Sequence, residues 1–358
     1  MKFFVNAKTL SNALAIVGRA ISGKPAQPIL GSVKIQISDA QAVLTGFDLS
    51  TAIIQSIPVD NLDDDTTVCI PYLLLSTIVA KLDGDLTISQ VENQVIIKSD
   101  TGEYTMSVLD SDDYPTLPTV EGEPIKLSGA TLREAIATVG SCASDDQTKQ
   151  VLTGINLQTV DGRLYFNATN GHVLSRFWAD GCQDNLSVTI PSHALQNVAK
   201  HTSEDIVLTI GDGQVEFESG DLKIIARILD GAYPKVGQLI PQQFLRTATV
   251  DSAQLKAAIG RVSAFADQKN NLVILNFADS KLKVSSQSMD VGQGMETLKC
   301  ELVGDGIELA ANIKYLSTGI NALSAKTLKF SINESNQPVI ITAGDNSLFL
   351  IMPVQVVR

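Results

Sequence analysis

A histidine and a serine lie close together in the stretch ATNGHVLSRF, which begins at Ala168. His172 could act as a general base and Ser175 as a nucleophile, which would suit an acyl-transfer enzyme. That chemistry also needs a third group to orient the base, and the chain has no GxSxG nucleophile elbow. A single histidine near a strand turn is usually structural, so a hydrolase is the weaker interpretation.

Paired carboxylates are the other candidates for chemistry. Asp110 with Asp112, and Asp145 with Asp146, could bind a metal ion, but neither pair has the glycine-containing pattern of a calcium loop. We interpret them as turn residues. Neither a GxGxxG motif nor a phosphate loop ending in GK[ST] is present, which argues against nucleotide hydrolysis. The sequence therefore predicts no catalysis, no metal and no cofactor.

The cysteines are scattered and form no CxxC pair, so they predict neither a zinc site nor a disulfide framework. We expect buried thiols in a reducing cytosol for all of them, Cys69, Cys142, Cys182 and Cys300. No apolar run approaches the roughly 20 residues that a membrane-spanning helix needs, and the N-terminus does not resemble a secretory signal. A cytoplasmic protein without a membrane partner is expected.

The formal net charge is −12, which by itself argues against nucleic acid, because affinity for phosphates needs Lys and Arg. The position of the charges matters more than their sum. Acidic clusters, such as Asp63 to Asp65 and the trio Asp110, Asp112 and Asp113, are expected in loops and at strand ends, whereas several basic residues fall on predicted helices.

Those helices belong to a sequence that occurs three times, as VNAKTLSNALAIVGR, LSGATLREAIATVGS and VDSAQLKAAIGRVSA. The copies align Leu10 with Leu132 and Leu255, and apolar residues follow at i+4 and i+7, which is one face of a helix. A β-like stretch precedes each copy. The pattern predicts a strand followed by a helix, three times over.

A second similarity follows in each copy. CIPYLLLSTIVAKL and TIPSHALQNVAKHT predict a second helix with a proline in its first turn, and ELAANIKYLSTGINAL occupies the same place without the proline. Alternating segments with Gly, Asp or Asn between them then predict hairpins. The chain is therefore expected to be α+β, with three tandem domains at residues 1–121, 122–245 and 246–358.

Six short motifs, in this order and spacing, carry a resemblance to a known family. They are KPAQPILGSV, LTGFDLS, QVLTGINL, ATNGHVLSRF, AYPKVGQLIP and FLIMPVQ. The chain resembles the bacterial DNA polymerase III β subunit family, the sliding clamps, over essentially its whole length. The resemblance implies a DNA-clamp domain of two helices packed on antiparallel sheets, present in three copies, and a head-to-tail ring of two chains.

The resemblance also implies a function without catalysis. A sliding clamp is a processivity factor for DNA replication that encircles duplex DNA independently of sequence. It tethers the DNA polymerase III α subunit, clamp-loader subunits and other peptide-motif proteins. A scaffold of repeated domains that binds peptides but no DNA is the alternative. The residues implied to face the duplex are Lys24, Arg133, Lys149, Lys200 and Lys256.

The loop before Lys149 departs from some relatives, which carry Gln and aromatic residues where this chain has Asp145, Asp146 and Gln147. The implied DNA contact at Lys149 is therefore expected to differ from theirs.

The resemblance implies a cleft for an extended partner peptide between the second and third domains. Its residues would be Leu152, Thr169, Gly171, His172, Val173, Leu174, Pro234, Leu239, Asn312, Pro338, Val339, Leu350, Met352, Pro353 and Val354. Without the resemblance, Leu350 and Met352 would be interpreted as a last strand packed in the core.

Three features of the cleft depart from the family. Val173 stands where many relatives have Arg, Asn170 stands where Asp is common, and the chain continues to Val356, Val357 and Arg358.

The dimer contact is implied at Tyr104 and Met106 on one side and at Ala264 and Phe265 on the other. Phe265 could equally be a core residue. An exposed apolar pair would be the better sign of an interface.

Overall fold

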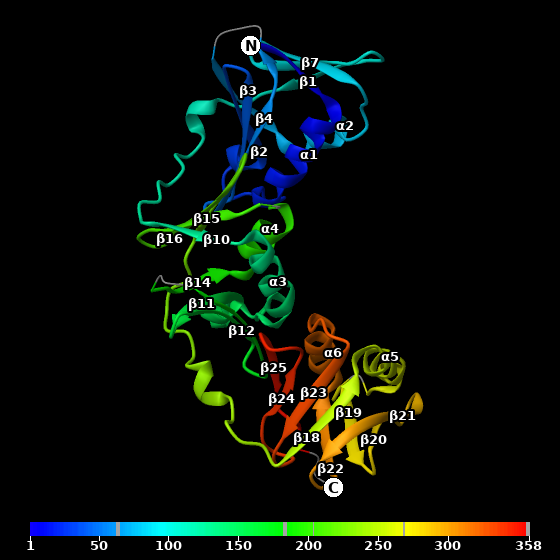
Figure 1. Cartoon of the computed structure of the whole chain (residues 1–358). Coiled ribbons are helices and arrows are strands. Elements are labelled where there is room, and N and C mark those ends of the chain that lie inside the picture. Colours follow the sequence, from blue (N-terminus) through cyan, green and yellow to red (C-terminus); the bar gives the residue numbers. More distant parts are fainter. Residues whose placement is uncertain (62–64, 182–184, 203, 268, 356–358) are drawn as a thin grey trace. The chain divides into compact units, whose positions relative to one another are not determined.

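The structure is a computed structural model of the chain and describes all residues except 62–64, 182–184, 203, 268 and 356–358 (Figure 1). Contacts divide the chain into two compact units, residues 1–130 with 196–228, and residues 131–195 with 229–358. No helix in the described part of the chain is long and apolar enough to cross a membrane.

The first unit contains two antiparallel sheets, in the orders β5-β1-β7-β8-β9 and β10-β15-β16-β17-β4-β3-β2-β6. The strands are β1 (Lys2–Asn6), β2 (Ser32–Ser38), β3 (Gln41–Phe47), β4 (Thr51–Pro58), β5 (Asp60–Asn61), β6 (Thr66–Pro71), β7 (Asp85–Val91), β8 (Gln94–Lys98), β9 (Glu103–Ser107), β10 (Pro124–Leu127), β15 (Ile206–Ile210), β16 (Gln214–Ser219) and β17 (Leu222–Arg227).

The second unit contains one long antiparallel arrangement, in the order β14-β11-β12-β13-β25-β24-β23-β18-β21-β20-β19-β22. The strands are β11 (Gly154–Val160), β12 (Arg163–Thr169), β13 (Val173–Asp180), β14 (Ser187–Pro191), β18 (Arg246–Asp251), β19 (Leu272–Ala278), β20 (Lys281–Ser288), β21 (Gly292–Val303), β22 (Ile307–Asn312), β23 (Thr327–Ile332), β24 (Val339–Thr342) and β25 (Ser347–Ile351).

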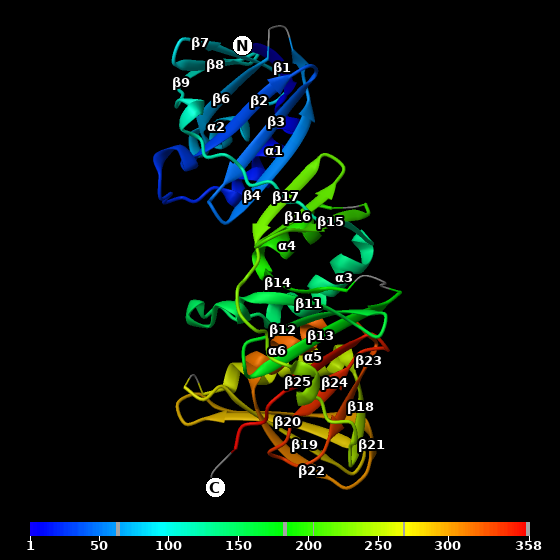
Figure 2. The same ribbon diagram turned by 90° about the vertical axis from the view of Figure 1, so that its left-hand side faces the viewer.

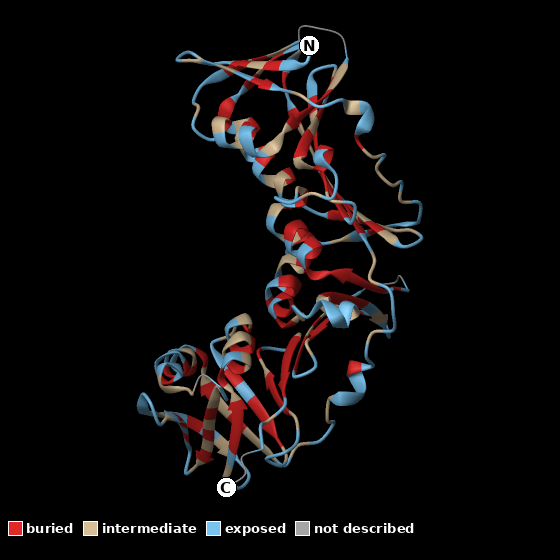
Figure 3. Cartoon of the chain, turned by 180° about the vertical axis from the view of Figure 1, so that it is seen from behind, coloured by how far each residue is buried: buried red, intermediate tan, exposed pale blue. Residues whose placement is uncertain are grey.

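The described residues form two α-helices in each copy of the repeat. They are α1 (Ala7–Val17), α2 (Tyr72–Val79), α3 (Gly129–Val139), α4 (Ser192–His201), α5 (Ser252–Val262) and α6 (Ile313–Ala322). Short 3-10 turns are η1 (Gly18–Ala20), η2 (Pro28–Gly31), η3 (Ser111–Asp113), η4 (Gly140–Cys142), η5 (Gln147–Thr153), η6 (Val236–Leu239) and η7 (Ser263–Phe265). Figure 3 shows the buried residues concentrated in the sheets and on one side of the helices.

The threefold strand–helix pattern is confirmed. Each predicted helix begins directly after a short strand, as β1 with α1, β10 with α3 and β18 with α5. The aligned leucines are all buried, with exposed fractions of 1% for Leu10, 1% for Leu132 and 0% for Leu255. Asn6 caps α1 and Asp251 caps α5, each accepting a hydrogen bond from a backbone N–H of the first turn. Periodicity and capping chemistry together determine these helices.

The prolines of the second helices do not lie in the first helical turn as predicted. Pro71 ends β6 and is the N-cap of α2, and Pro191 ends β14 directly before α4. Both strands are the last in their sheets, where a residue without an N–H is tolerated because one side of the strand is unpaired. In the third copy, Asn312 caps α6 instead, accepting from Lys314 N and Tyr315 N.

Strand pairing joins successive copies of the repeat within each unit. In the first unit β17 pairs with β4, from Leu222 opposite Gln55 to Ala226 opposite Thr51. In the second, β25 pairs with β13 in the same antiparallel manner, as Figure 2 shows. Because these junctions cross the predicted limits at 121 and 245, the compact units do not follow the three copies. The domain limits therefore stay a prediction.

Leu255→Ala is expected to destabilise the fold by about 2–5 kcal/mol, since it removes a fully buried side chain and leaves a cavity. Gln254→Ala, one position earlier on the exposed side of α5, is the matched control and should change stability by less than about 0.5 kcal/mol. Urea unfolding followed by circular dichroism measures both. Equal effects of the two variants would contradict the predicted helix face.

Candidate functional site

The predicted cleft lies where β13 pairs with β25, inside the second unit. Val173 is opposite Ile351, and Leu174 is opposite Leu350. Leu174 and Leu350 are buried in one apolar cluster with Val236, Ile340 and Leu348, and Tyr233, Ile240, Phe244 and Trp178 pack against it. Leu350 is therefore packed in the core, as the alternative interpretation predicted, and its place in the cleft stays a prediction.

The turn between β12 and β13 is held by side-chain hydrogen bonds. Asn170 Oδ1 accepts from His172 N at 3.0 Å and from Val173 N at 3.1 Å. Thr169 Oγ1 donates to Val173 O at 2.5 Å and accepts from Gly171 N at 3.1 Å. Gly171 has a φ of +91°, which favours glycine. An asparagine can accept the same bonds as an aspartate, so the departure at residue 170 preserves the turn but removes its charge.

His172 contacts the third copy of the repeat through its ring. Its imidazole stacks on the Tyr315 ring of α6, with centroids 5.3 Å apart and an angle of 16° between the planes. Its carbonyl accepts a hydrogen bond from Met352 N at 3.2 Å. The residue is exposed and joins three segments, the β12–β13 turn, α6 and the residues after β25.

The nucleophile–base pair does not form. Ser175 is buried, and its hydroxyl donates to Thr138 O at 2.9 Å rather than to a histidine. His172 lies in the turn before β13, and its ring stacks on Tyr315 instead of meeting the Ser175 hydroxyl. The geometry gives no support to acyl transfer.

The members of the predicted cleft differ in exposure. Leu239 and Met352 are 54% and 42% exposed, and Pro234 and Val354 are exposed as well. Thr169, Val173 and Val339 are buried, whereas Leu152, Asn312, Pro338 and Pro353 are intermediate. Val354 N donates to Ala310 O at 2.7 Å, which fixes the chain after β25 beside β22. Leu152, in η5, is not a member of the buried cluster.

Sequence reasoning missed Arg176, which alternates with Leu174 and Trp178 along β13. Its guanidinium lies over the Tyr165 ring, 4.8 Å from the centroid, and Nε donates to Asn167 Oδ1 at 2.7 Å. Burial lowers the pKa of Arg176 from its ordinary value. The period of two from Leu174 was the available signal for its position.

Tyr233, from the AYPKVGQLIP motif, anchors the segment that covers this cluster. Its hydroxyl donates to Asn167 O at 3.2 Å. Burial raises the pKa of the phenol, so it stays protonated throughout the neutral range.

His172→Ala is expected to weaken binding of a partner peptide by roughly twofold to tenfold, because it removes the aromatic stack that supports the turn. Tyr315→Ala should have the same effect, and the double variant should lose no more than either one. Fluorescence anisotropy with a labelled polymerase-tail peptide measures this. Tyr315→Phe, which retains the ring, is the matched control. Independent, additive losses would contradict the stacking role.

The residues predicted to face DNA lie on several elements. Arg133 is on α3, Lys200 is at the end of α4 and Lys256 is on α5. Lys256 Nζ donates to Leu323 O at 2.9 Å, at the C-terminal end of α6, which is a favourable place for a cation. Lys24 and Lys149 are exposed and lie outside the α-helices.

Acidic neighbours reduce the positive potential around Lys149. Asp146 accepts hydrogen bonds from Thr148 N at 3.0 Å and from its hydroxyl at 2.7 Å. These bonds lower the pKa of the Asp146 carboxyl, so it is ionised at neutral pH. Lys149 N donates to Asp146 O, which keeps the lysine within the same turn. A phosphate would meet a mixed charge here.

The helices and the rest of the chain differ in charge. The α-helices in the described residues carry one acidic side chain, Glu134, and the basic side chains Lys8, Arg133, Lys200, Lys256, Arg261 and Lys314. Their formal charge is +5. Because the whole chain has a net charge of −12, the residues outside the α-helices carry −17. Arg261 is engaged with Glu296 in an ion pair. The α-helices therefore carry a net positive charge and the rest of the chain a net negative one.

The predicted dimer residues lie on two surfaces, one in each unit. Tyr104 and Met106 are on β9, which ends its sheet. Met106 is only 4% exposed and packs within its own unit, whereas Tyr104 is half-buried. Ala264 is exposed and Phe265 is half-buried in η7, where its ring lies against Gly294 of β21. Phe265 is thus partly packed and partly accessible.

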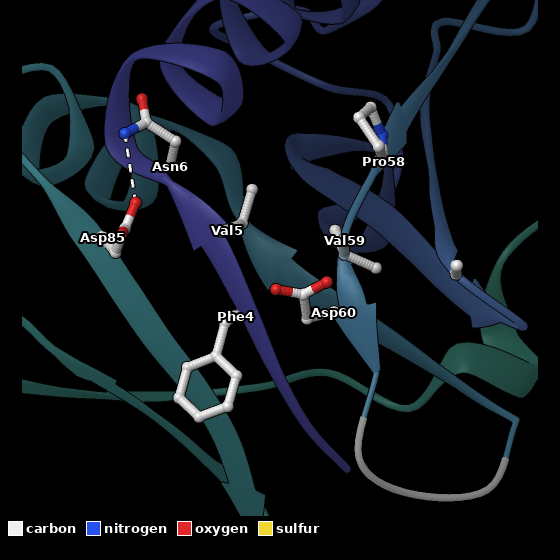
Figure 4. A pocket seen from close by; sticks show the side chains of 8 residues that line it. Phe4, Val5, Asn6, Pro58, Val59, Asp60 and Asp85 are labelled. Atoms are coloured by element: carbon white, nitrogen blue, oxygen red, sulfur yellow. Dashed lines mark hydrogen bonds between the residues drawn. The ribbon is translucent and has the colours of Figure 1, made fainter.

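A cavity of about 450 Å³ in the first unit is separate from all the predicted site residues (Figure 4). It lies between β1 and β5, with Phe4, Val59 and Asp60 in its lining. Asn6 Nδ2 donates to Asp85 Oδ1 at 3.2 Å at its rim. The two carboxylates make this cavity unsuited to phosphate, so it adds nothing to a DNA interface.

The remaining sequence expectations concern thiols and acidic clusters. Cys69, Cys142 and Cys300 are buried and free, as predicted, and burial raises the pKa of Cys69 and Cys142 to about 11. Cys182, Asp63, Asp64 and the terminal residues 356–358 lie outside the described residues. Asp110 caps η3 by accepting from Asp112 N, which is the role of a turn residue. The described residues contain no group of His, Cys, Asp or Glu able to hold a metal ion.

Comparison with known proteins covers the chain from end to end. The DNA polymerase III beta subunit N-terminal, central and C-terminal domains match residues 1–118, 126–235 and 237–355. The beta sliding clamp of Synechocystis sp. is 38% identical over the full length of both chains. The beta sliding clamp of Staphylococcus aureus is 29% identical over 99% of each.

Solved structures show the same fold. The DNA polymerase sliding clamp of Bacillus subtilis superposes with a TM-score of 0.94 at 26% identity and covers 100% of both chains. The sliding clamp of Pseudomonas aeruginosa, solved with bound griselimycin, has a TM-score of 0.94 at 21% identity over 99% of this chain and 100% of its own. With three tandem clamp domains matched in order, the chain belongs to the DNA polymerase III beta subunit family, the beta sliding clamps.

Proposed function

We propose that two copies of this chain close head to tail into a ring around duplex DNA and tether replication proteins to it. The observation that carries the proposal is the pattern of strand junctions. Successive copies are joined by β17 with β4 and by β25 with β13. A third junction of the same kind is needed to close a circle of repeats, and among the described strands none of the first copy pairs with one of the third.

The unpaired edges that remain fit that third junction. Among the described strands, β9 pairs only with β8, and the part of β21 before Cys300 pairs only with β20. Exposed strand edges invite pairing with another chain. A second copy would place its β9 against β21 of the first, near Tyr104 on one side and Phe265 on the other, and the symmetry-related contact would close the ring.

The charge segregation supports DNA as the enclosed partner. We infer that the net positive helices face the duplex and that the acidic remainder faces outward. Contacts from Lys24, Arg133, Lys149, Lys200 and Lys256 would reach phosphates, which carry no sequence information. Each added phosphate contact increases the affinity and so slows movement along the duplex. A small set of such contacts therefore allows sliding. Residence then comes from enclosure, and no catalysis is required.

The cleft at β13 and β25 would hold the partner peptides. Met352 and Leu239 offer exposed apolar surface, and a flexible methionine adapts to different side chains. Polar groups of the β12–β13 turn would bind the backbone of an extended peptide. The polymerase α subunit and clamp-loader subunits are the proposed partners, which places the protein in the cytoplasm with the replicating DNA.

Molar mass in solution tests the ring. We expect light scattering to give twice the chain mass of 38.2 kDa over a wide range of concentrations. Tyr104→Arg should shift the mass toward a single chain by placing a cation at the junction, whereas Asp100→Ala, in the exposed turn before β9, should not. A strictly single-chain particle in the unmodified protein would exclude the ring.

A further inference from the structure

The first unit contains a cavity of about 200 Å³ that the proposed function does not use. It lies between the β3–β4 turn, β17 and the segment that follows Tyr114. Ala52 and Ile225 belong to its apolar lining, and Leu49 and Thr116 line it from the turn and from that segment. All of these residues are in one compact unit.

The surroundings of this cavity repeat the construction of the cleft in the second unit. Asp48 Oδ1 accepts from Ser50 N at 2.9 Å and from Thr51 N at 2.7 Å. Asn170 Oδ1 accepts from the corresponding His172 N and Val173 N. The two turns are therefore the same structure at two places in the chain.

Two further contacts are repeated. Arg227 N donates to Ser50 O at 2.9 Å, as Met352 N donates to His172 O at 3.2 Å. The Tyr114 hydroxyl donates to Thr45 O at 3.4 Å, as that of Tyr233 donates to Asn167 O. Each tyrosine anchors the segment that passes over the strand junction. The cavity is thus the counterpart of the cleft, at the junction of β4 with β17.

The turn differs from its counterpart at one position. Leu49 has a φ of +76°, where the second unit has Gly171. A bulky residue in the left-handed region is strained, typically by about 1–2 kcal/mol. Glycine would relieve the strain, but only leucine supplies an apolar side chain, which is 43% exposed and lines the cavity. Strain of this kind occurs at functional sites, so it points to a ligand that contacts the Leu49 side chain.

The polar groups of the cavity require partners of a defined kind. Gln214 Oε1 is buried and has no hydrogen-bond partner among the described residues. A buried acceptor without a donor is costly, and a peptide N–H would satisfy it. Arg227 lines the same cavity, is exposed, and takes part in none of the ion pairs found in the described residues. Its guanidinium suits a carboxylate.

We propose that this cavity is a second peptide-docking site, which takes an extended segment with one apolar side chain next to an acidic residue. The cavity, at about 200 Å³, is smaller than most small-molecule sites, which usually measure roughly 300–1,000 Å³. It has room for a single side chain. Leu49, Ala52 and Ile225 contact the apolar side chain, Gln214 accepts from the backbone, and Arg227 binds the carboxylate. The cavity has the proposed cleft of the second unit as its structural counterpart, but different variants test the two sites.

The test is a titration of the full-length protein with the peptide acetyl-Ala-Leu-Asp-Ala-amide, followed by methyl NMR. We expect saturable shifts of the Ile225 and Leu49 methyl groups. Replacing the peptide leucine with serine should weaken binding by roughly tenfold to a hundredfold, because an apolar side chain is no longer buried. Replacing its aspartate with asparagine should weaken binding by roughly twofold to fivefold, as expected for one exposed ion pair.

Protein variants separate this site from the cleft. Leu49→Gly should abolish the saturable shifts without lowering the unfolding midpoint, since it removes the wall and relieves the strain. Thr116→Trp, which fills the mouth from an exposed position, should do the same. Met352→Ala is the matched control in the second unit and should leave the Ile225 shifts unchanged, whatever it does to partner peptides.

Three outcomes would overturn the proposal. One is a set of shifts confined to Leu350 and Met352, which would place the peptide in the cleft alone. Another is undiminished binding by Leu49→Gly. The third is a response that does not saturate or does not distinguish leucine from serine in the peptide, which would mean weak nonspecific contact. None of these outcomes bears on polymerase stimulation through the cleft, so the two proposals fail independently.

Discussion

Cutting a circular duplex is expected to release the loaded protein. On a closed circle the ring cannot leave without opening, whereas on a linear duplex it slides off an end. The contacts cannot hold it, because the helices offer few cations, Lys256 is already hydrogen-bonded to Leu323 O, and Asp146 lies beside Lys149. We expect the residence time to fall by about two orders of magnitude or more on linearisation.

The measurement uses labelled protein placed on a nicked circle by a clamp loader, followed by gel filtration with and without a restriction enzyme. A linear duplex with bulky proteins fixed at both ends is the matched control and should retain the ring as the circle does. Raising the salt should weaken the residual attraction to linear DNA but leave the circular complex nearly intact, since enclosure does not depend on phosphate contacts. Equal loss from circular and linear DNA would disprove enclosure.

Deleting residues 352–358 is expected to abolish polymerase stimulation while the dimer persists. The deletion removes the exposed Met352 side chain and two backbone hydrogen bonds, from Met352 N to His172 O and from Val354 N to Ala310 O. The cleft would lose one wall and the fixed position of its turn. The proposed dimer edges, β9 and β21, are made of other segments and should be unaffected.

Primer extension on a long single-stranded circle measures the stimulation, and light scattering measures the dimer. Deleting only residues 356–358 is the matched control, because it leaves both hydrogen bonds in place. Met352→Ala should give an intermediate loss if the side chain and the backbone contacts both contribute. Full stimulation by the 352–358 deletion would remove the cleft assignment.

Much of the fold was predictable from local chemistry. Leu10, Leu132 and Leu255 each begin an apolar pattern at i, i+4 and i+7, and the residues that precede two of those helices are the capping residues Asn6 and Asp251. The sequence predicted Pro71 and Pro191 in the first turn of their helices, whereas each precedes its helix and ends a strand. The sequence does not reveal that these strands lie at sheet edges, where a proline is tolerated. The cleft residues were implied by family resemblance and by no local sequence pattern.

The sequence by itself determined the threefold strand–helix repeat, the helix faces and the surplus of positive charge on the helices, because all of these depend on residues close together in the chain. Only the tertiary structure decided that His172 stacks on Tyr315, that Ser175 bonds to Thr138 instead of a histidine, and that Met106 is buried. It also decided that the turn at Asp48 has the same hydrogen bonds as the turn at Asn170. The turn at Asp48 lies beside a cavity whose lining includes Gln214, with a side-chain oxygen that has no hydrogen-bond partner among the described residues. The stack and the repeated turn depend on strand pairs that join residues more than a hundred positions apart, and the surroundings of Ser175 and Met106 depend on how their strands pack. No local sequence pattern determines such pairing and packing.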